Sequence, residues 1–144
     1  MDTKFRCNCP ITSTLDILGD KWMLVIIKQI LIENKHTFKD FTESDEAIAT
    51  NILSTKLKVL EEFAIIKKTK LPHNKKTNLY LLTDKGLALI PLIVELAAWG
   101  DDNLRELNPT LIDNEAMEIL RTDKNTFANM LEERYRKKVA SLNI

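Results

Sequence analysis

The sequence predicts a mainly α fold of the α+β type, in which one short β-hairpin interrupts a series of helices. The clearest helical pattern spans Thr50–Phe63, where leucines recur at i, i+4 and i+7 and form an inward-facing stripe. Residues 67–71 and 77–82 follow it as two short runs, the second rich in Thr, Tyr and Leu. The sequence Pro-His-Asn-Lys-Lys lies between these runs, so we expect a hairpin with a basic loop.

Three further helices are predicted before this hairpin. Residues 13–18 form a short helix that Gly19 ends, and residues 21–32 are apolar on most faces. The second segment fits either a buried helix or a strand, but its length and the central Lys-Gln pair favour a helix with Asp20 as N-cap. A small helix is expected over Thr37–Thr42.

Helices also follow the hairpin. Thr83 or Asp84 caps a helix that continues through Trp99 and stops near Gly100. From Pro109 onward the pattern predicts one or two amphipathic helices, with a break around residues 122–125.

The charge of the chain is unevenly distributed. The 144 residues have a formal net charge of zero, yet residues 50–78 contain seven lysines and only two acids. Residues 101–144 contain seven basic and nine acidic groups. Because attraction of a polyanion depends on the local field, a neutral total does not argue against nucleic-acid binding. A solvated lysine face is the simpler interpretation of the same pattern.

Helices, hairpin and following helix together have the order of a winged helix-turn-helix, in which the second helix of the motif enters the major groove of DNA. The outer face of Thr50–Phe63 carries short or hydrogen-bonding side chains, of which Asn51 can pair bidentately with adenine. The predicted DNA contacts from this helix are Thr50, Asn51, Ser54, Thr55, Lys56 and Lys58, and those from the wing are His73, Asn74, Lys75 and Lys76. Double-stranded DNA is thus the expected partner. Alternatively, the same polar face contacts a partner protein, without specific DNA binding.

Other function classes lack support in the sequence. There is no glycine-rich phosphate loop and no recognisable nucleophile triad, so we expect neither catalysis nor a cofactor. His36 and His73 lie on different predicted elements, so no metal site is expected despite the pair Cys7 and Cys9. No apolar stretch reaches the ~20 residues of a membrane span and no secretory signal is present, so we expect a cytoplasmic protein with reduced thiols.

Several motifs resemble the HxlR family of bacterial transcription regulators, in one register over residues 7–100. They are Cys9-Pro10-Ile11, Leu15-Asp16-Ile17-Leu18-Gly19-Asp20-Lys21-Trp22, Leu53-Ser54-Thr55-Lys56-Leu57-Lys58-Val59-Leu60-Glu61-Glu62, Tyr80-Leu81-Leu82-Thr83-Asp84-Lys85-Gly86 and Ala97-Ala98-Trp99-Gly100. The resemblance implies a winged-helix homodimer, MarR-like in general architecture, that binds a pseudo-palindromic operator and has no catalytic activity.

The resemblance also implies roles for particular residues. Family dimers use the first helix and helices after the wing, which here points to Leu15, Leu18, Leu92, Leu96 and Trp99. Cys9 stands where several members carry a cysteine that senses oxidants or electrophiles, with Cys7 beside it; a nearby Arg6 or the start of a helix would lower its pKa. An unreactive, partly buried thiol is the alternative.

The chain departs from the family pattern in three places, one of which is a tail after Gly100 that is longer than the family minimum. Ala47-Ile48-Ala49 replaces the usual Gly-Ile-Ser, so the cap of the next helix shifts to Thr50 or is missing, at a cost of roughly 1 kcal/mol. Asn51, Thr55 and Lys56 stand where arginines are frequent, so the operator sequence does not carry over. We therefore expect residues 1–100 to form the DNA-binding domain with an N-terminal arm, and residues 101–144 to form a helical extension that adds to the dimer interface.

Overall fold

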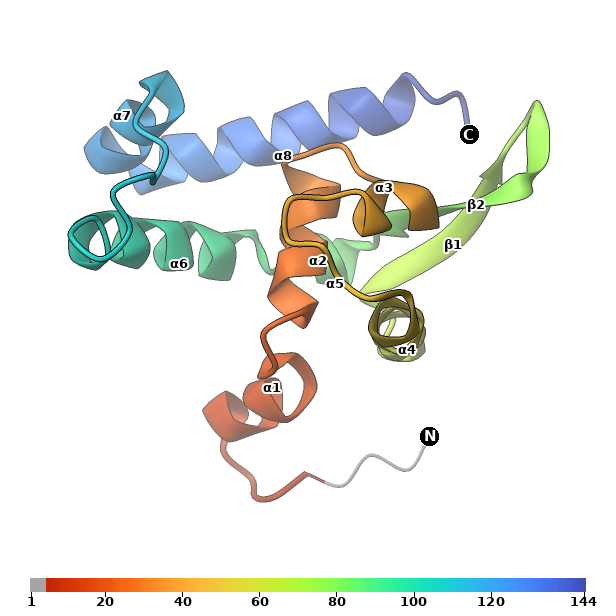
Figure 1. Cartoon of the computed structure of the whole chain (residues 1–144), viewed down its shortest axis with the longest axis horizontal. Coiled ribbons are helices and arrows are strands. Elements are labelled where there is room, and N and C mark those ends of the chain that lie inside the picture. Colours follow the sequence, from red (N-terminus) through yellow and green to blue (C-terminus); the bar gives the residue numbers. More distant parts are fainter. Residues whose placement is uncertain (1–4) are drawn as a thin grey trace.

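The computed structural model describes residues 5–144, so the first four residues of the predicted N-terminal arm lie outside the described part. The described chain folds into helices and one two-stranded antiparallel sheet (Figure 1). The elements are α1 (Pro10–Leu18), α2 (Met23–Leu31), α3 (Phe38–Thr42), α4 (Thr50–Glu62), β1 (Ile66–Leu71), β2 (Asn74–Leu82), α5 (Asp84–Leu87), α6 (Ile90–Asn103), α7 (Glu115–Thr122) and α8 (Lys124–Ala140). This order confirms the predicted winged helix-turn-helix fold class.

Capping chemistry determines where α2 and α3 begin. Helix α2 starts at Met23, two residues later than predicted, and its N-cap position is Trp22 and not Asp20. The Asp20 carboxylate still accepts hydrogen bonds from the amides of Trp22 and Met23, which stabilises the turn that leads into α2. At α3, Thr37 accepts from the Asp40 amide and the Asp40 carboxylate accepts from the Thr37 amide, which together form a capping box. The starts of α2 and α3 are therefore set by residues that lie next to them in the sequence.

The loop before α4 explains why the family pattern places glycine there. Ala47 has φ 52°, in the left-handed region that costs an L-residue about 1–2 kcal/mol and costs glycine almost nothing. Ala49 occupies the N-cap of α4 and makes no side-chain hydrogen bond. Of the two expected alternatives, the structure shows the missing cap.

The hairpin is tighter than predicted. The strands pair from Ile66 opposite Leu82 to Lys70 opposite Asn78, with an irregularity after Lys70. Only Pro72 and His73 lie between the strands, so Asn74, Lys75 and Lys76 belong to β2 and not to a five-residue loop. The basic residues thus stand on a defined strand.

The helix predicted from residue 84 to Gly100 is in fact two helices. Thr83 caps α5 as expected, accepting a hydrogen bond from the Gly86 amide, but α5 ends at Leu87. Pro91 has no amide hydrogen and clashes with a preceding turn, so it is favoured in the first turn of a helix, and α6 starts there. The second helix then passes Gly100 and ends at Asn103.

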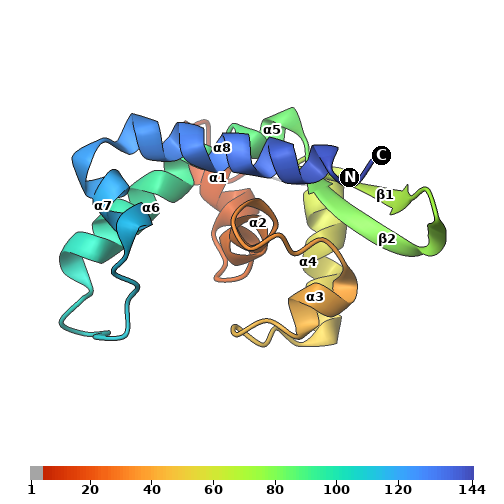
Figure 2. The same cartoon turned by 90° about the horizontal axis from the view of Figure 1, so that it is seen from above.

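Isoleucines of α2 lie at the centre of the core, and helices from both ends of the chain surround them. Ile26, Ile27 and Ile30 are fully buried. The C-terminal part forms two helices, confirming the predicted break, and α8 packs against α2, α6 and α7. Figures 1 and 2 show α8 passing beside α2 and α6. Its residues Phe127 and Leu131 belong to the same core. The extension therefore shares the hydrophobic core of the preceding part.

Candidate nucleic-acid interface

The outward face of α4 is polar and accessible. Its buried face contains Leu53, Leu57 and Leu60, confirming the predicted stripe. The predicted contact residues Thr50, Asn51, Ser54, Thr55 and Lys58 are all exposed on the other side. A helix with one apolar stripe and short polar side chains opposite it can enter the major groove, where each base pair presents its own hydrogen-bonding pattern.

Lys56 does not share this face. Its ammonium group lies 2.7 Å from a carboxylate oxygen of Asp20, and its side chain is only 25% exposed. Partial burial opposes ionisation of Asp20, but hydrogen bonds from Lys56 and from the amides of Trp22 and Met23 keep the pKa of Asp20 below its ordinary value. Lys56 thus ties α4 to the start of α2, and its contact with a phosphate stays a prediction.

A second tie holds the loop that leads into α4. Glu46 pairs with Lys28 and accepts a hydrogen bond from the buried amide of Gln29, 2.8 Å away, while Ile48 is buried. These contacts orient the first turn of α4 relative to α2. The partners lie far apart in the sequence, and no local pattern predicted them.

A groove separates α3 from the hairpin, and we call it the α3–wing groove. It has a volume of about 700 Å³ and is lined by Thr37, Phe38, Lys39, Thr42, Thr50, Lys76, Thr77, Asn78 and Tyr80. Two predicted contact residues, Thr50 of α4 and Lys76 of β2, thus line one groove. The sequence analysis did not predict the polar residues of α3 or Asn78 as part of the site. The capping residue Thr37 marks the start of α3, and the alternation of side chains along the second strand could have indicated Asn78.

The predicted wing residues His73, Asn74, Lys75 and Lys76 are exposed. Asn74 also has a structural role, because its side-chain amide donates to the Thr77 hydroxyl at 3.1 Å and its oxygen accepts from the Lys76 amide. The two lysines extend a cationic surface beyond the groove. Such a surface suits the phosphate backbone, whereas the face of α4 suits base edges.

Cys9 stands at the N-cap of α1. Hydrogen bonds from the amide and hydroxyl of Thr12 and from the amide of Ile11 lower the pKa of this thiol. Arg6 instead pairs with Asp16, 2.5 Å away, so the helix start and not Arg6 supplies the stabilisation. Cys7 and Cys9 are both free thiols, and the described residues contain no cluster that could hold a metal ion.

The residues predicted for a dimer interface divide into two groups. Leu15 of α1 and Leu92, Leu96 and Trp99 of α6 are exposed, with Trp99 61% accessible. Leu18 is 5% exposed and packs in the core, because it faces inward from the last turn of α1; its predicted role in dimer contacts is corrected. Ile11, 72% exposed, was missed and adds to the apolar surface of α1. Figure 1 shows α1 and α6 away from the wing.

This arrangement, with a helix-turn-helix followed by a β-hairpin wing, defines a DNA-binding protein of the winged helix-turn-helix class. The chain belongs to the HxlR-like helix-turn-helix family, whose model matches residues 17–108, and the resemblance seen in the sequence is confirmed. It is a transcriptional regulator of this family.

Relatives and solved structures agree with this assignment. The HTH-type transcriptional regulator YodB of Bacillus subtilis is 35% identical over 94 residues, which cover 65% of this chain and 83% of YodB. The redox regulator HypR in its reduced form has 27% identity and a TM-score of 0.59 over 70% of this chain and 99% of HypR. Quinone-bound YodB has 33% identity and a TM-score of 0.54 over 66% of this chain and 99% of that chain. No helix within residues 5–144 is both long and apolar enough to cross a membrane.

Proposed function

We propose that the protein regulates transcription as a cytoplasmic homodimer that occupies a pseudo-palindromic operator and has no catalytic role. One observation carries this proposal: Thr50 lies on the exposed polar face of α4 and also lines the α3–wing groove, so the two surfaces are continuous. On this proposal α4 reads base edges through Asn51, and phosphates bind along the groove at Lys39 and Lys76.

The apolar side chains left exposed on α1 and α6 support the proposed dimer. Leu15 of α1 is at least half exposed, and so are Leu96 and Trp99, which are three residues apart and share one side of α6. Apolar side chains grouped on one exposed helix face are typical of a protein interface. Two copies related by a two-fold axis would present two α4 helices to successive half-sites. The C-terminal extension contributes its own surface next to α6 through α7.

Salt dependence separates this function from the alternative, a winged helix that binds only a partner protein. Contacts to phosphates release counterions, so affinity for duplex DNA should fall steeply between low and physiological salt. Affinity for a random duplex that stays constant over this range would contradict the DNA-binding proposal.

Two substitutions should have different effects on DNA binding. Lys76→Ala is expected to weaken binding to the operator and to random duplex by similar factors and to reduce the salt slope by about 1, since it removes one phosphate contact. Asn51→Ala should relax preference at one base position, at a cost of about 1–3 kcal/mol on the operator only. Fluorescence anisotropy with both duplexes measures these effects, and equal behaviour of the two variants would contradict this division of roles.

A second candidate function, sensing of oxidants or electrophiles, is favoured by the position of Cys9 at the start of α1. Its lowered pKa increases the thiolate fraction. We propose that the thiolate adds to a quinone carbon, forming a C–S bond while the ring takes up a proton and becomes a hydroquinone. HypR is described as a redox regulator, and YodB has been solved with quinone bound.

A quinone should therefore weaken operator binding of the wild type and leave the Cys9→Ser variant unaffected. The reason is that an adduct at the N-cap of α1 would displace the start of this helix, which we assign to the dimer interface, and so would disturb the dimer that binds the operator. Cys7→Ser is the matched control, because Cys7 lies outside the helix, and it should respond like the wild type. Electrophoretic mobility shifts and intact mass measure the two steps; identical responses of wild type and Cys9→Ser would exclude Cys9.

A further inference from the structure

The last turns of α8 carry a cationic patch that the net charge of the segment conceals. Residues 101–144 contain more acids than bases, yet four of the five residues from 134 to 138 are Arg or Lys. All four of these side chains are exposed. The family model ends at residue 108, so this patch lies outside the part of the chain that the family shares.

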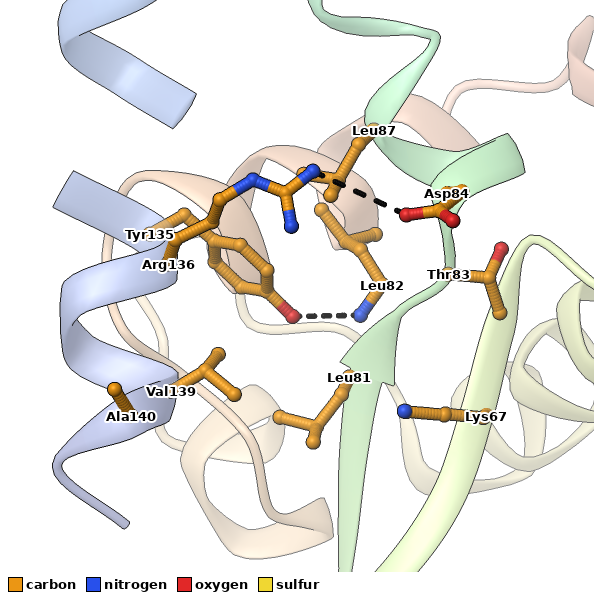
Figure 3. A pocket seen from close by; sticks show the side chains of 10 residues that line it. All are labelled: Lys67, Leu81, Leu82, Thr83, Asp84, Leu87, Tyr135, Arg136, Val139 and Ala140. Atoms are coloured by element: carbon orange, nitrogen blue, oxygen red, sulfur yellow. Dashed lines mark hydrogen bonds and ion pairs between the residues drawn. The ribbon is translucent and has the colours of Figure 1, made fainter. Parts of the chain in front are cut away.

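One of the four cations is already neutralised. Arg136 pairs with Glu132 at 2.9 Å and lies 3.9 Å from Asp84 of α5, across the pocket drawn in Figure 3. Within residues 5–144, none of the ion pairs of α8 involves Arg134, Lys137 or Lys138. Arg134 and Lys138 are four residues apart and so share one flank of the helix, with Lys137 beside them. We call these three residues the α8 basic end.

The α8 basic end is held in a defined place by the side chains beneath it. Tyr135 is 4% exposed, and its hydroxyl accepts a hydrogen bond of 2.7 Å from the Leu82 amide at the base of the wing (Figure 3). Leu131, one turn earlier, is also buried in the core. A cation on such a helix loses less conformational freedom on binding a phosphate than one on a free tail.

This patch adjoins the α3–wing groove through His36. The ring centroids of His36 and Tyr135 are 6.4 Å apart, so the last turns of α8, which carry Lys138, lie beside the residue that precedes α3. Burial lowers the pKa of His36, and the charge of Lys138 acts in the same direction. The His36 carbonyl accepts from the Tyr80 amide at 2.7 Å, and both Thr37 and Tyr80 line the groove. The carboxylate of Asp40 in α3 is engaged by the amides of His36 and Thr37.

We propose that the α8 basic end is a second phosphate-binding surface, which extends the DNA contact of this protein beyond the wing. It rests on the proposed function, because the groove must bind DNA for the duplex backbone to pass the end of α8. The proximity of Tyr135 on α8 to His36, and the fact that Arg134, Lys137 and Lys138 form no ion pair within residues 5–144, favour DNA over an acidic protein. Its contribution is independent of base sequence.

Two charge reversals on α8 test this proposal: one at its C-terminal end within the α8 basic end, and a control at its N-terminal end. Lys138→Glu should weaken binding to a long random duplex by about tenfold, since a contact to phosphate is replaced by repulsion. Lys124→Glu makes the same change at the opposite end of α8, beside Glu95, and should leave this affinity within about twofold. Circular dichroism melts of both variants confirm that they fold.

A neutralised variant defines the number of contacts. Arg134→Gln/Lys138→Gln should lower the slope of log affinity against log salt by about 2, and hydroxyl-radical protection should shorten at the outer edge of each half-site. Equal slopes and equal protection in this variant and the wild type would overturn the second surface while leaving the groove proposal intact. A wild-type protein that does not bind DNA would instead overturn both proposals. If the double variant binds DNA like the wild type but loses affinity for an acidic protein, the α8 basic end is a surface for that protein and not for DNA.

Discussion

Replacing Leu96 by glutamate is expected to convert the dimer into a monomer and to lower operator affinity by about 100-fold or more. Leu96 is 50% exposed on α6, between Leu92 and Trp99, so its side chain would be buried only when a second copy packs against it. A carboxylate placed in such an interface loses its hydration without gaining a partner charge. Each half-site would then bind a single copy, and the gain from simultaneous binding of two would disappear.

Size-exclusion chromatography with light scattering at micromolar concentration measures this change directly. Ile32→Glu is a suitable control, because Ile32 is 45% exposed at the end of α2 and lies outside α1 and α6. It should leave the mass unchanged. A dimer that persists in Leu96→Glu, or a wild type that elutes as a monomer, would contradict the assignment of α6 to the interface.

Tyr135 should have the second large effect, on stability. Tyr135→Ala removes a buried ring that belongs to the core and is expected to lower the free energy of unfolding by about 3–5 kcal/mol. Tyr135→Phe keeps the ring and removes only the oxygen that accepts from the Leu82 amide, so this buried amide loses its partner at a cost of about 1–3 kcal/mol.

Urea denaturation followed by circular dichroism separates the ring from the hydroxyl. The adjacent Arg134→Ala is the control, since Arg134 is exposed and its replacement should change stability by no more than about 0.5 kcal/mol. A Tyr135→Phe protein as stable as the wild type would show that the hydrogen bond between α8 and the wing base contributes little. The expected result would make the C-terminal extension a structural support of the wing.

Features that depend on neighbouring residues were predictable from the sequence. The spacing of three leucines defines the buried side of α4, and its polar side followed from the same periodicity. Thr37 and Asp40 determine the start of α3 through a capping box, which needs only a few residues of backbone. The sequence analysis was wrong at Pro91, which it placed inside one long helix, whereas Pro91 lies in the first turn of a new helix, α6.

The part of the candidate site that depends on helical periodicity was predicted from the sequence, and the part that depends on distant contacts was not. Thr50, Asn51 and Ser54 lie on the outer face because helical periodicity alone decides which side they occupy. Lys56 stands on the same helix, but a partner near α2 decides where its ammonium group goes. Lys39 and Asn78 joined the site only when α3 and β2 came together around one groove.

The sequence by itself thus determined most of the elements, their order and the family, because periodicity, caps and turn residues act over short range and the family motifs keep one register. The tertiary structure alone decided three matters: that Lys56 turns to Asp20, that Leu18 enters the core, and that the α8 basic end lies beside the wing. Each of these depends on contacts between residues far apart in the chain, and such contacts exist only once the helices have packed around α2.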